Sequence, residues 1–169
     1  VPLDENELRR FYQSNKEDYR VPAEATFTHV FVTFDGRDEP TAERLAIQLQ
    51  KTLNELEIPF ERSGQFGERF LYNKNYAERS DGEVSSHFGE SFQRHIFALN
   101  PSALWQGPVR SNYGYHLILL KKLKKSSIPK FDEVISVVVE DAQRQQSREI
   151  KREAIKKLVE KYRITVLNE

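Results

Sequence analysis

The pattern of apolar and polar positions along the chain predicts two strong β-strands at residues 25–34 (ATFTHVFVTF) and 113–123 (YGYHLILLKKL). Both segments are rich in β-branched, aromatic or other large apolar side chains, and the first is apolar on both faces, as in a central strand. Each contains one histidine, His29 or His116. A buried imidazole needs hydrogen-bond partners for its ring nitrogens, so the two histidines require an explanation.

Helical periodicity appears on either side of the first strand. Residues 3–19 read as a helix in which Asp4 and Glu7 have the spacing of a capping box. Residues 41–57 predict a second helix, with Thr41 as its N-cap. The apolar side chains that we expect to line the buried face of this second helix are Leu45, Leu49, Leu53 and Leu56.

The middle of the chain is less regular. Residues 65–72 (QFGERFLY) predict a short strand, and residues 80–99 predict one helix with apolar residues at fourfold spacing. The loop that follows, NPSALWQGPV, leads into another short strand.

Residues 131–162 predict one long helix or two. Their middle, residues 140–149, is almost entirely polar, so we expect the helix to leave the main body there. The residues that we expect to pack again further on are Ala154, Leu158 and Tyr162, and residues 163–168 (RITVLN) predict a last short strand.

Composition narrows the function. Of 169 residues, 38% are apolar and 31% charged, with a formal net charge of zero, so nothing in the charge favours a nucleic-acid partner. The absence of cysteine excludes disulfide scaffolds, thiolate catalysis and cysteine metal sites. No run approaches the roughly 20 apolar residues of a membrane span. Because the chain starts at Val1 without Met, we expect it to be part of a longer protein with its targeting segment upstream.

Three segments resemble the parvulin family of peptidyl-prolyl cis/trans isomerases. They are residues 28–32 (THVFV), 88–99 (FGESFQRHIFAL) and 105–120 (WQGPVRSNYGYHLILL). The resemblance implies an α+β fold, with an antiparallel four-stranded sheet surrounded by helices and flanked by N- and C-terminal helices. The domain limits that follow are an N-terminal helical flank at 1–22, an isomerase domain at 23–125, and a C-terminal helical tail at 126–169 packing with the N-terminal flank.

The resemblance also implies catalytic residues. In parvulins, the positions of His29 and His116 form a facing pair, and a hydroxyl, here Ser111, holds one ring. Two neutral imidazoles and a hydroxyl can satisfy one another in a buried site. We therefore expect the two rings within hydrogen-bonding reach; the alternative is two unrelated core histidines.

Substrate contact is implied for Phe88 and Phe92, which lie four residues apart where parvulins carry the apolar side chains under the proline. Phe70 is a third candidate. The alternative for this aromatic stripe is ordinary core packing. The reaction rotates an amide bond without cleaving it, so it needs an apolar cup rather than a nucleophile.

The implied function is prolyl isomerase (rotamase, PpiC-type) activity on proline-containing unfolded or exported polypeptides. The flanks resemble those of bacterial extracytoplasmic parvulins, implying a periplasmic folding factor that an upstream segment tethers to the inner membrane. The sequence departs from the family in a short loop that has no Cys or clear acidic equivalent facing the prolyl carbonyl. Stand-ins are Ser63, Glu61 and Glu68; Asp81 comes too late in the order. This departure favours the alternative, a catalytically weak or inactive chaperone module that binds apolar segments.

Two further features carry less weight. His87 and His95 lie eight residues apart on the predicted helix, about 12 Å along it, too far for one metal ion, so we expect no metal and no cofactor. The basic cluster at residues 121–125 (KKLKK) is typical of solvated lysines, and would meet anionic lipid only near a bilayer.

Overall fold

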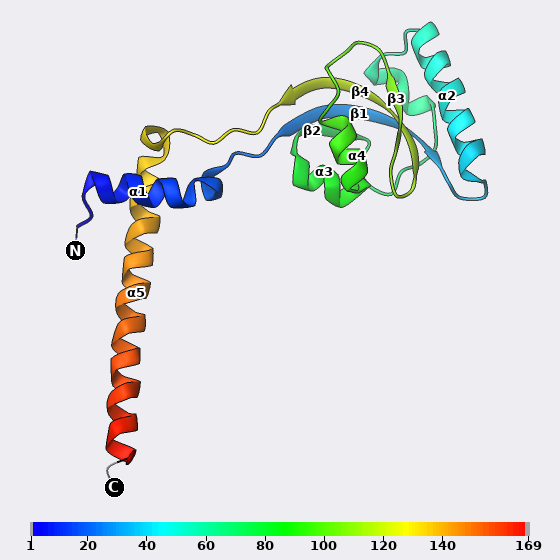
Figure 1. Cartoon of the computed structure of the whole chain (residues 1–169). Coiled ribbons are helices and arrows are strands. Elements are labelled where there is room, and N and C mark those ends of the chain that lie inside the picture. Colours follow the sequence, from blue (N-terminus) through cyan, green and yellow to red (C-terminus); the bar gives the residue numbers. More distant parts are fainter. Residues whose placement is uncertain (1, 168–169) are drawn as a thin grey trace. The chain divides into compact units, whose positions relative to one another are not determined.

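The protein is described by a computed structural model covering residues 2–167, with side chains described for residues 2–163 (Figure 1). It divides into two compact units, Pro22–Ser127 and the two chain ends, Val1–Val21 with Ile128–Glu169. Its elements are α1 (Glu5–Asn15), the 3-10 helix η1 (Lys16–Tyr19), β1 (Glu24–Thr33), α2 (Glu39–Glu55), the 3-10 helix η2 (Phe60–Gln65), β2 (Asn75–Ser80), α3 (Asp81–Phe88), α4 (Glu90–Ile96), β3 (Gln106–Arg110), β4 (Gly114–Lys124) and α5 (Phe131–Leu167).

The central unit is built on a four-stranded sheet in the order β2-β1-β4-β3, with every neighbouring pair antiparallel. The predicted α+β class and four-stranded antiparallel sheet are therefore confirmed. His29 and His116 lie on the adjacent central strands β1 and β4, where Phe31 pairs with His116 and His29 pairs with Ile118. This register brings the two histidines to neighbouring positions on one face of the sheet.

Both faces of the sheet are buried. Helices α3 and α4 lie on the face of the sheet that carries the histidines, and α2 lies on the opposite face (Figure 1). The side chains that face α3 and α4 form a core dominated by aromatic rings, among them Phe27, Phe31, Tyr76, Phe88 and Phe92. On the other face, the indole of Trp105 packs beside Val30 and Leu117 and donates a hydrogen bond to Ile58 O at 2.9 Å. A central strand covered on both faces explains why residues 25–34 carry apolar side chains on both faces.

The N-terminal end of α2 differs from the prediction. Its N-cap is Asp38, whose carboxylate accepts from the Thr41 backbone N–H at 2.9 Å, so Thr41 is not the cap. Leu45 and Leu56 are exposed; the fully buried positions are Ala42, Ala46 and Leu53. The predicted buried face of α2 is therefore partly wrong. The helix face that carries the two alanines packs on the sheet because their small side chains allow a closer approach.

Residues 65–72 do not form the predicted strand. Gln65 ends η2, and residues 66–72 form a loop that touches β1 through a single bridge between Phe31 and Glu68. The edge strand is β2 instead. Gly67 has φ +74, and a Cβ there would lie 2.6 Å from Val30 and 2.8 Å from Phe31 O. The hydrophobic pattern missed β2 because only Tyr76 of its six residues is buried.

The single helix predicted for residues 80–99 is two helices. Gly89 has φ +98 and separates α3 from α4, and a Cβ there would meet the Asn112 side chain at 2.9 Å. Only glycine adopts this conformation at little cost, so the helical hydrogen bonding is interrupted at that residue.

The unit made from the chain ends pairs α1 with the start of α5. Asp4 and Glu7 form the predicted capping box. Leu8 and Tyr12 pack with apolar side chains of α5, and the Tyr12 hydroxyl donates to Pro129 O at 2.6 Å.

Helix α5 continues without a break through Leu167, and the structure contradicts two expectations for it. Ala154, Leu158 and Tyr162 are exposed rather than packed again. Residues 163–167 are helical, so the predicted last strand is wrong over the described residues; residue 168 lies outside them. The segment contains no glycine or proline to end the helix.

Candidate active site

The two core histidines contact each other directly. Nδ1 of His29 and Nδ1 of His116 lie 2.9 Å apart, and the ring centroids are 4.9 Å apart. Both residues are buried. The hydrogen-bonding distance expected from the sequence is therefore present, and the two rings are not separate core histidines.

The pair belongs to a longer hydrogen-bonded chain. His116 Nε2 lies 2.7 Å from Ser111 Oγ, and His29 Nε2 lies 2.8 Å from Asn73 O. A carbonyl oxygen only accepts, so His29 donates from Nε2 and its Nδ1 accepts from His116 Nδ1–H. His116 Nε2 then accepts from the Ser111 hydroxyl. One order of protons satisfies every ring nitrogen with both imidazoles neutral.

Burial keeps these imidazoles neutral. Loss of solvation, together with the nearby Lys74 charge and despite the Asn73 hydrogen bond, lowers the pKa of His29 to about 4. Burial, followed by its neighbour His29, lowers the pKa of His116 well below its ordinary value. Charging either ring would place an ion in a low-dielectric core and reverse a hydrogen bond in the chain.

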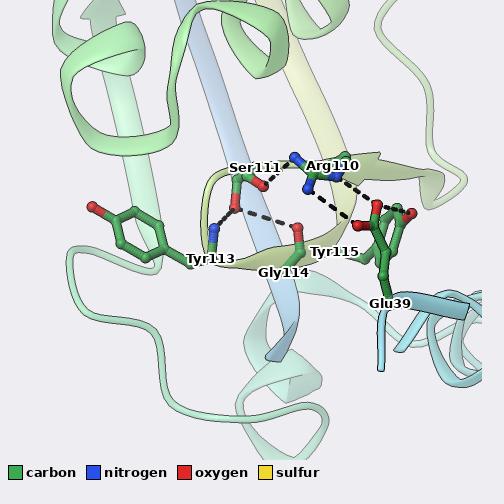
Figure 2. A network of polar contacts seen from close by, with 6 residues as sticks. All are labelled: Glu39, Arg110, Ser111, Tyr113, Gly114 and Tyr115. Carbon is green, nitrogen blue, oxygen red and sulfur yellow. Dashed lines mark hydrogen bonds and ion pairs between the residues drawn. The ribbon is translucent and has the colours of Figure 1, made fainter. Parts of the chain in front are cut away.

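The hydroxyl that orients His116 is held by the turn between β3 and β4 (Figure 2). Ser111 Oγ accepts from the Tyr113 backbone N–H at 3.1 Å, and the Ser111 N–H donates to Gly114 O at 2.8 Å. The turn runs so close to β1 that a Cβ on Gly114 would lie 2.1 Å from Val32 O. Glycine at this position thus lets β4 start beside β1.

The same turn is tied to the first turn of α2 (Figure 2). Arg110 donates to both carboxylate oxygens of Glu39, from Nε at 2.6 Å and from Nη2 at 3.2 Å. The Tyr115 hydroxyl donates to the same carboxylate at 3.2 Å. The side chains of Arg110 and Glu39 are roughly half exposed, so their ion pair fixes position more than it adds stability.

Three phenylalanine rings pack against the histidine pair. Phe88 and Phe92 stack with centroids 4.1 Å apart, and each lies 5.1 Å from the His116 ring. Phe70 stacks on Phe88 at 4.9 Å and stands edge-on to His116 at 5.1 Å. Phe88 and Phe92 are 0% exposed, whereas Phe70 is 9% exposed. The structure thus brings all three predicted phenylalanines together, with Phe70 as the outermost.

The loop that carries Phe70 is fastened at both ends to β1. Glu68 N–H donates to Phe31 O at 2.8 Å, and the Glu68 carboxylate accepts from the Thr33 N–H at 2.7 Å. Arg37 donates to both oxygens of that carboxylate, at 2.7 and 3.0 Å. At the other end, the His29 N–H donates to Lys74 O at 3.3 Å. Residues 69–73 therefore span a short gap with Phe70 pointing inward.

Residues 3–136 match the family model of the PPIC-type peptidyl-prolyl isomerase domain. The chain belongs to this isomerase family. It is 27% identical over 136 residues to Cbf2 of Campylobacter jejuni, whose name assigns it provisionally as a peptidyl-prolyl cis-trans isomerase; the match covers 79% of this chain and 48% of Cbf2. It is 22% identical to the foldase protein PrsA of Clostridium botulinum, over 96% of this chain and 45% of PrsA.

The chain thus spans about half the length of the curated relatives it matches. A solved Campylobacter jejuni chain has a similar fold, with a TM-score of 0.57 and 22% identity over 94% of this chain and 62% of its own. That structure comes from work on the virulence factor PEB4 and the periplasmic protein Cj1289, which describes them as SurA-like chaperones.

The residues suggested as replacements for the missing Cys or Asp lie at separate places in the fold. Ser63 is buried and donates to Phe60 O, and Glu61 lies beside a groove on the α2 face of the sheet. Asp81 begins α3. Only Glu68 lines the same hollow as His29, and Arg37 already engages its carboxylate.

The sequence alone did not identify two parts of the candidate site. One is Asn73 O, the terminal acceptor of the histidine chain; a backbone carbonyl leaves no signal in side-chain patterns. The other is Phe31, which stacks on His116 with centroids 4.8 Å apart. Its position two residues after His29 in a strand places it on the same face, and that alternation could have identified it.

Two kinds of feature are absent from the part of the chain that the structure describes. No group of three or more histidine, cysteine, aspartate or glutamate side chains among those residues is arranged to hold a metal ion. Within the same residues, every helix is too short or too polar to span a bilayer.

Proposed function

We propose that this domain catalyses cis/trans isomerisation of X-Pro bonds in unfolded or exported polypeptides, and that residues 23–125 carry the activity between helical flanks at 1–22 and 126–169. The observation that carries the proposal is the neutral chain Ser111–His116–His29–Asn73 beneath three phenylalanine rings. Family membership supports the same reaction.

The reaction suits such a site because it forms and breaks no covalent σ bond. Amide resonance sets a barrier of about 18–20 kcal/mol, and lowering it by about 4 kcal/mol accelerates the rotation about 10³-fold. An apolar cup removes water from the prolyl amide and disfavours the planar, charge-separated form. The uncharged histidine pair provides a rigid floor that carries no charge of its own. We assign His29, His116 and Ser111 to this floor.

Phe70 must move before a pyrrolidine ring can reach Phe88, because Phe70 stacks on Phe88 and neither Phe88 nor Phe92 has exposed surface. Hollows of about 540 and 420 Å³ flank the Phe70 ring and give it room. In this proposal the incoming proline displaces Phe70, which then packs on the outer side of the bound ring. Phe88 and Phe92 form the inner wall.

We propose an extracytoplasmic location, in a bacterial periplasm, with a segment outside this chain as tether to the inner membrane. The support is indirect: one relative is named a foldase and another comes from work on a periplasmic protein. Proline-containing exported polypeptides would be the partners there.

A second candidate is a chaperone module that binds apolar segments without isomerising them. The closed cup favours it, because Phe88 and Phe92 have no exposed surface. The absence of cysteine from the chain, and so from the loop of Phe70, favours it too.

An isomerisation assay on a proline peptide separates the two candidates. Wild type should exceed the uncatalysed rate, and Phe92→Ala should lower kcat/KM at least about tenfold. Phe92→Leu, which keeps much of the volume, guards against loss of the fold. Phe60→Ala, at an exposed ring on the α2 face of the sheet, should leave the rate unchanged. A wild-type rate equal to the blank, with suppressed aggregation of an unfolded client, would favour the chaperone.

A further inference from the structure

The hollow beside His29 contains two cations without a carboxylate partner. It has a volume of about 420 Å³ and lies between β1 and the loop of residues 64–74. His29, Phe70 and Tyr72 provide aromatic walls, and Lys74 and Arg69 provide positive charge. This combination differs from the neutral aromatic cup next to it.

The one carboxylate in the hollow is already engaged. Glu68 accepts from both guanidinium nitrogens of Arg37 and from the Thr33 N–H. In the part of the chain that the structure describes, no side chain forms a hydrogen bond or ion pair with the Lys74 ammonium or the Arg69 guanidinium. The hollow therefore carries two uncompensated positive charges.

Lys74 is held where its charge is costly. Partial burial lowers the pKa of its ammonium, and its charge contributes to lowering the pKa of His29. An anion bound in the hollow would relieve both effects, because it would restore part of the lost solvation and offset the field at the imidazole. The site is thus electrostatically prepared for a negative group.

Arg69 extends this charge to the other side of Phe70. It lines the second hollow as well, together with Phe34, Leu71 and Tyr113. That second hollow is also lined by Asp35, whereas the one carboxylate lining the hollow beside His29 is already paired with Arg37.

We infer that the hollow beside His29 binds the carboxylate of an aspartate or glutamate adjacent to the proline of the substrate. The inference rests on the proposed function and adds a substrate preference to it. The Lys74 ammonium and the Arg69 guanidinium hold the carboxylate, and Tyr72 and Phe70 pack on the side-chain methylenes. The domain therefore prefers acidic prolyl segments over neutral ones and discriminates against basic ones.

The test compares blocked peptides, acetylated and amidated, with Glu, Ala or Lys before the proline, and one with Glu after it. Affinity is measured by NMR titration and the rate by NMR exchange, so binding is read even if isomerisation is absent. One of the two Glu peptides should bind about fivefold more tightly than the Ala peptide at low salt. The Lys peptide should bind more weakly than the Ala peptide. The preference should shrink in 0.5 M NaCl, where screening acts within a few ångströms.

Variants locate the effect. Lys74→Met combined with Arg69→Gln should abolish the preference, and Lys121→Met, at an exposed lysine beside the groove on the α2 face, should retain it. Equal affinities for the Glu and Ala peptides would overturn the inference, as would a preference that survives in the double variant. The carboxylate could also come from a chain terminus, which an Ala-Pro peptide with a free C-terminal carboxylate tests. Tighter binding of that peptide alone would also overturn the inference. Absent catalysis with the preference intact would overturn only the isomerase proposal.

Discussion

Acidification should destabilise the protein through its histidine pair well above the pH at which carboxylates titrate. The pKa of His29 is about 4 in the folded protein and near 6.5 in the unfolded chain. Between these values the unfolded state binds more protons, so the free energy of unfolding decreases as the pH falls. For His29 alone, the loss from pH 7.5 is about 2 kcal/mol at pH 5 and about 3 kcal/mol at pH 4.

His116 should add to this loss, because its pKa is also lowered. The histidine effect is best measured between pH 7 and 5. Below pH 5, carboxylates whose pKa values are lowered in the fold, such as Glu39 beside Arg110, also lose stabilising interactions. The loss expected in the window is thus at least the His29 contribution.

Urea unfolding followed by fluorescence of the single, buried Trp105 provides the assay. The double variant His29→Gln/His116→Gln should be less stable at pH 7.5 but should lose little more on acidification to pH 5. The control His87→Gln/His95→Gln alters the other two histidines and should retain the wild-type slope. In parallel, NMR of wild type should show two imidazoles neutral at pH 5. A wild-type stability that stays constant from pH 7 to 5, or an equal slope in the first variant, would refute the reasoning.

Two further predictions concern the turn between β3 and β4. Ser111→Ala leaves His116 Nε2 without its buried donor and should cost about 1–3 kcal/mol in urea unfolding, with Ser111→Thr as the conservative control; no loss for the alanine variant would contradict the proton order assigned to the chain. Gly114→Ala forces a Cβ to 2.1 Å from Val32 O and should cost at least about 3 kcal/mol. Its matched control, Gly82→Ala in α3, meets nothing within 4 Å and should be neutral or slightly stabilising, so equal effects at the two glycines would refute the close approach of β4 to β1.

Much of the sheet was predictable because strand signals act over short distances. The apolar runs around His29 and His116 located the two central strands, and antiparallel pairing placed the histidines on one face. The capping box of Asp4 and Glu7 was equally local. Each of these features depends on residues a few positions apart.

Other elements were decided by packing. β2 is mostly polar, and it is a strand because β1 offers a free edge with Phe27 opposite Tyr76. In α2, Ala42 and Ala46 determine the buried face because small side chains permit close approach. Helix periodicity alone did not distinguish this face from the leucine stripe.

By itself, the sequence determined where the two histidines and the aromatic stripe lie along their strands and helices, because side-chain alternation and helical spacing fix which positions share a face. Only the tertiary structure decided that Phe70 closes the aromatic cup and that Asn73 O ends the hydrogen-bonded chain. Both belong to a loop without periodicity, and its path is set by contacts with a strand some 40 residues earlier, Glu68 with Phe31 and Asn73 with His29. The contacts of such a loop depend on the assembled sheet beneath it.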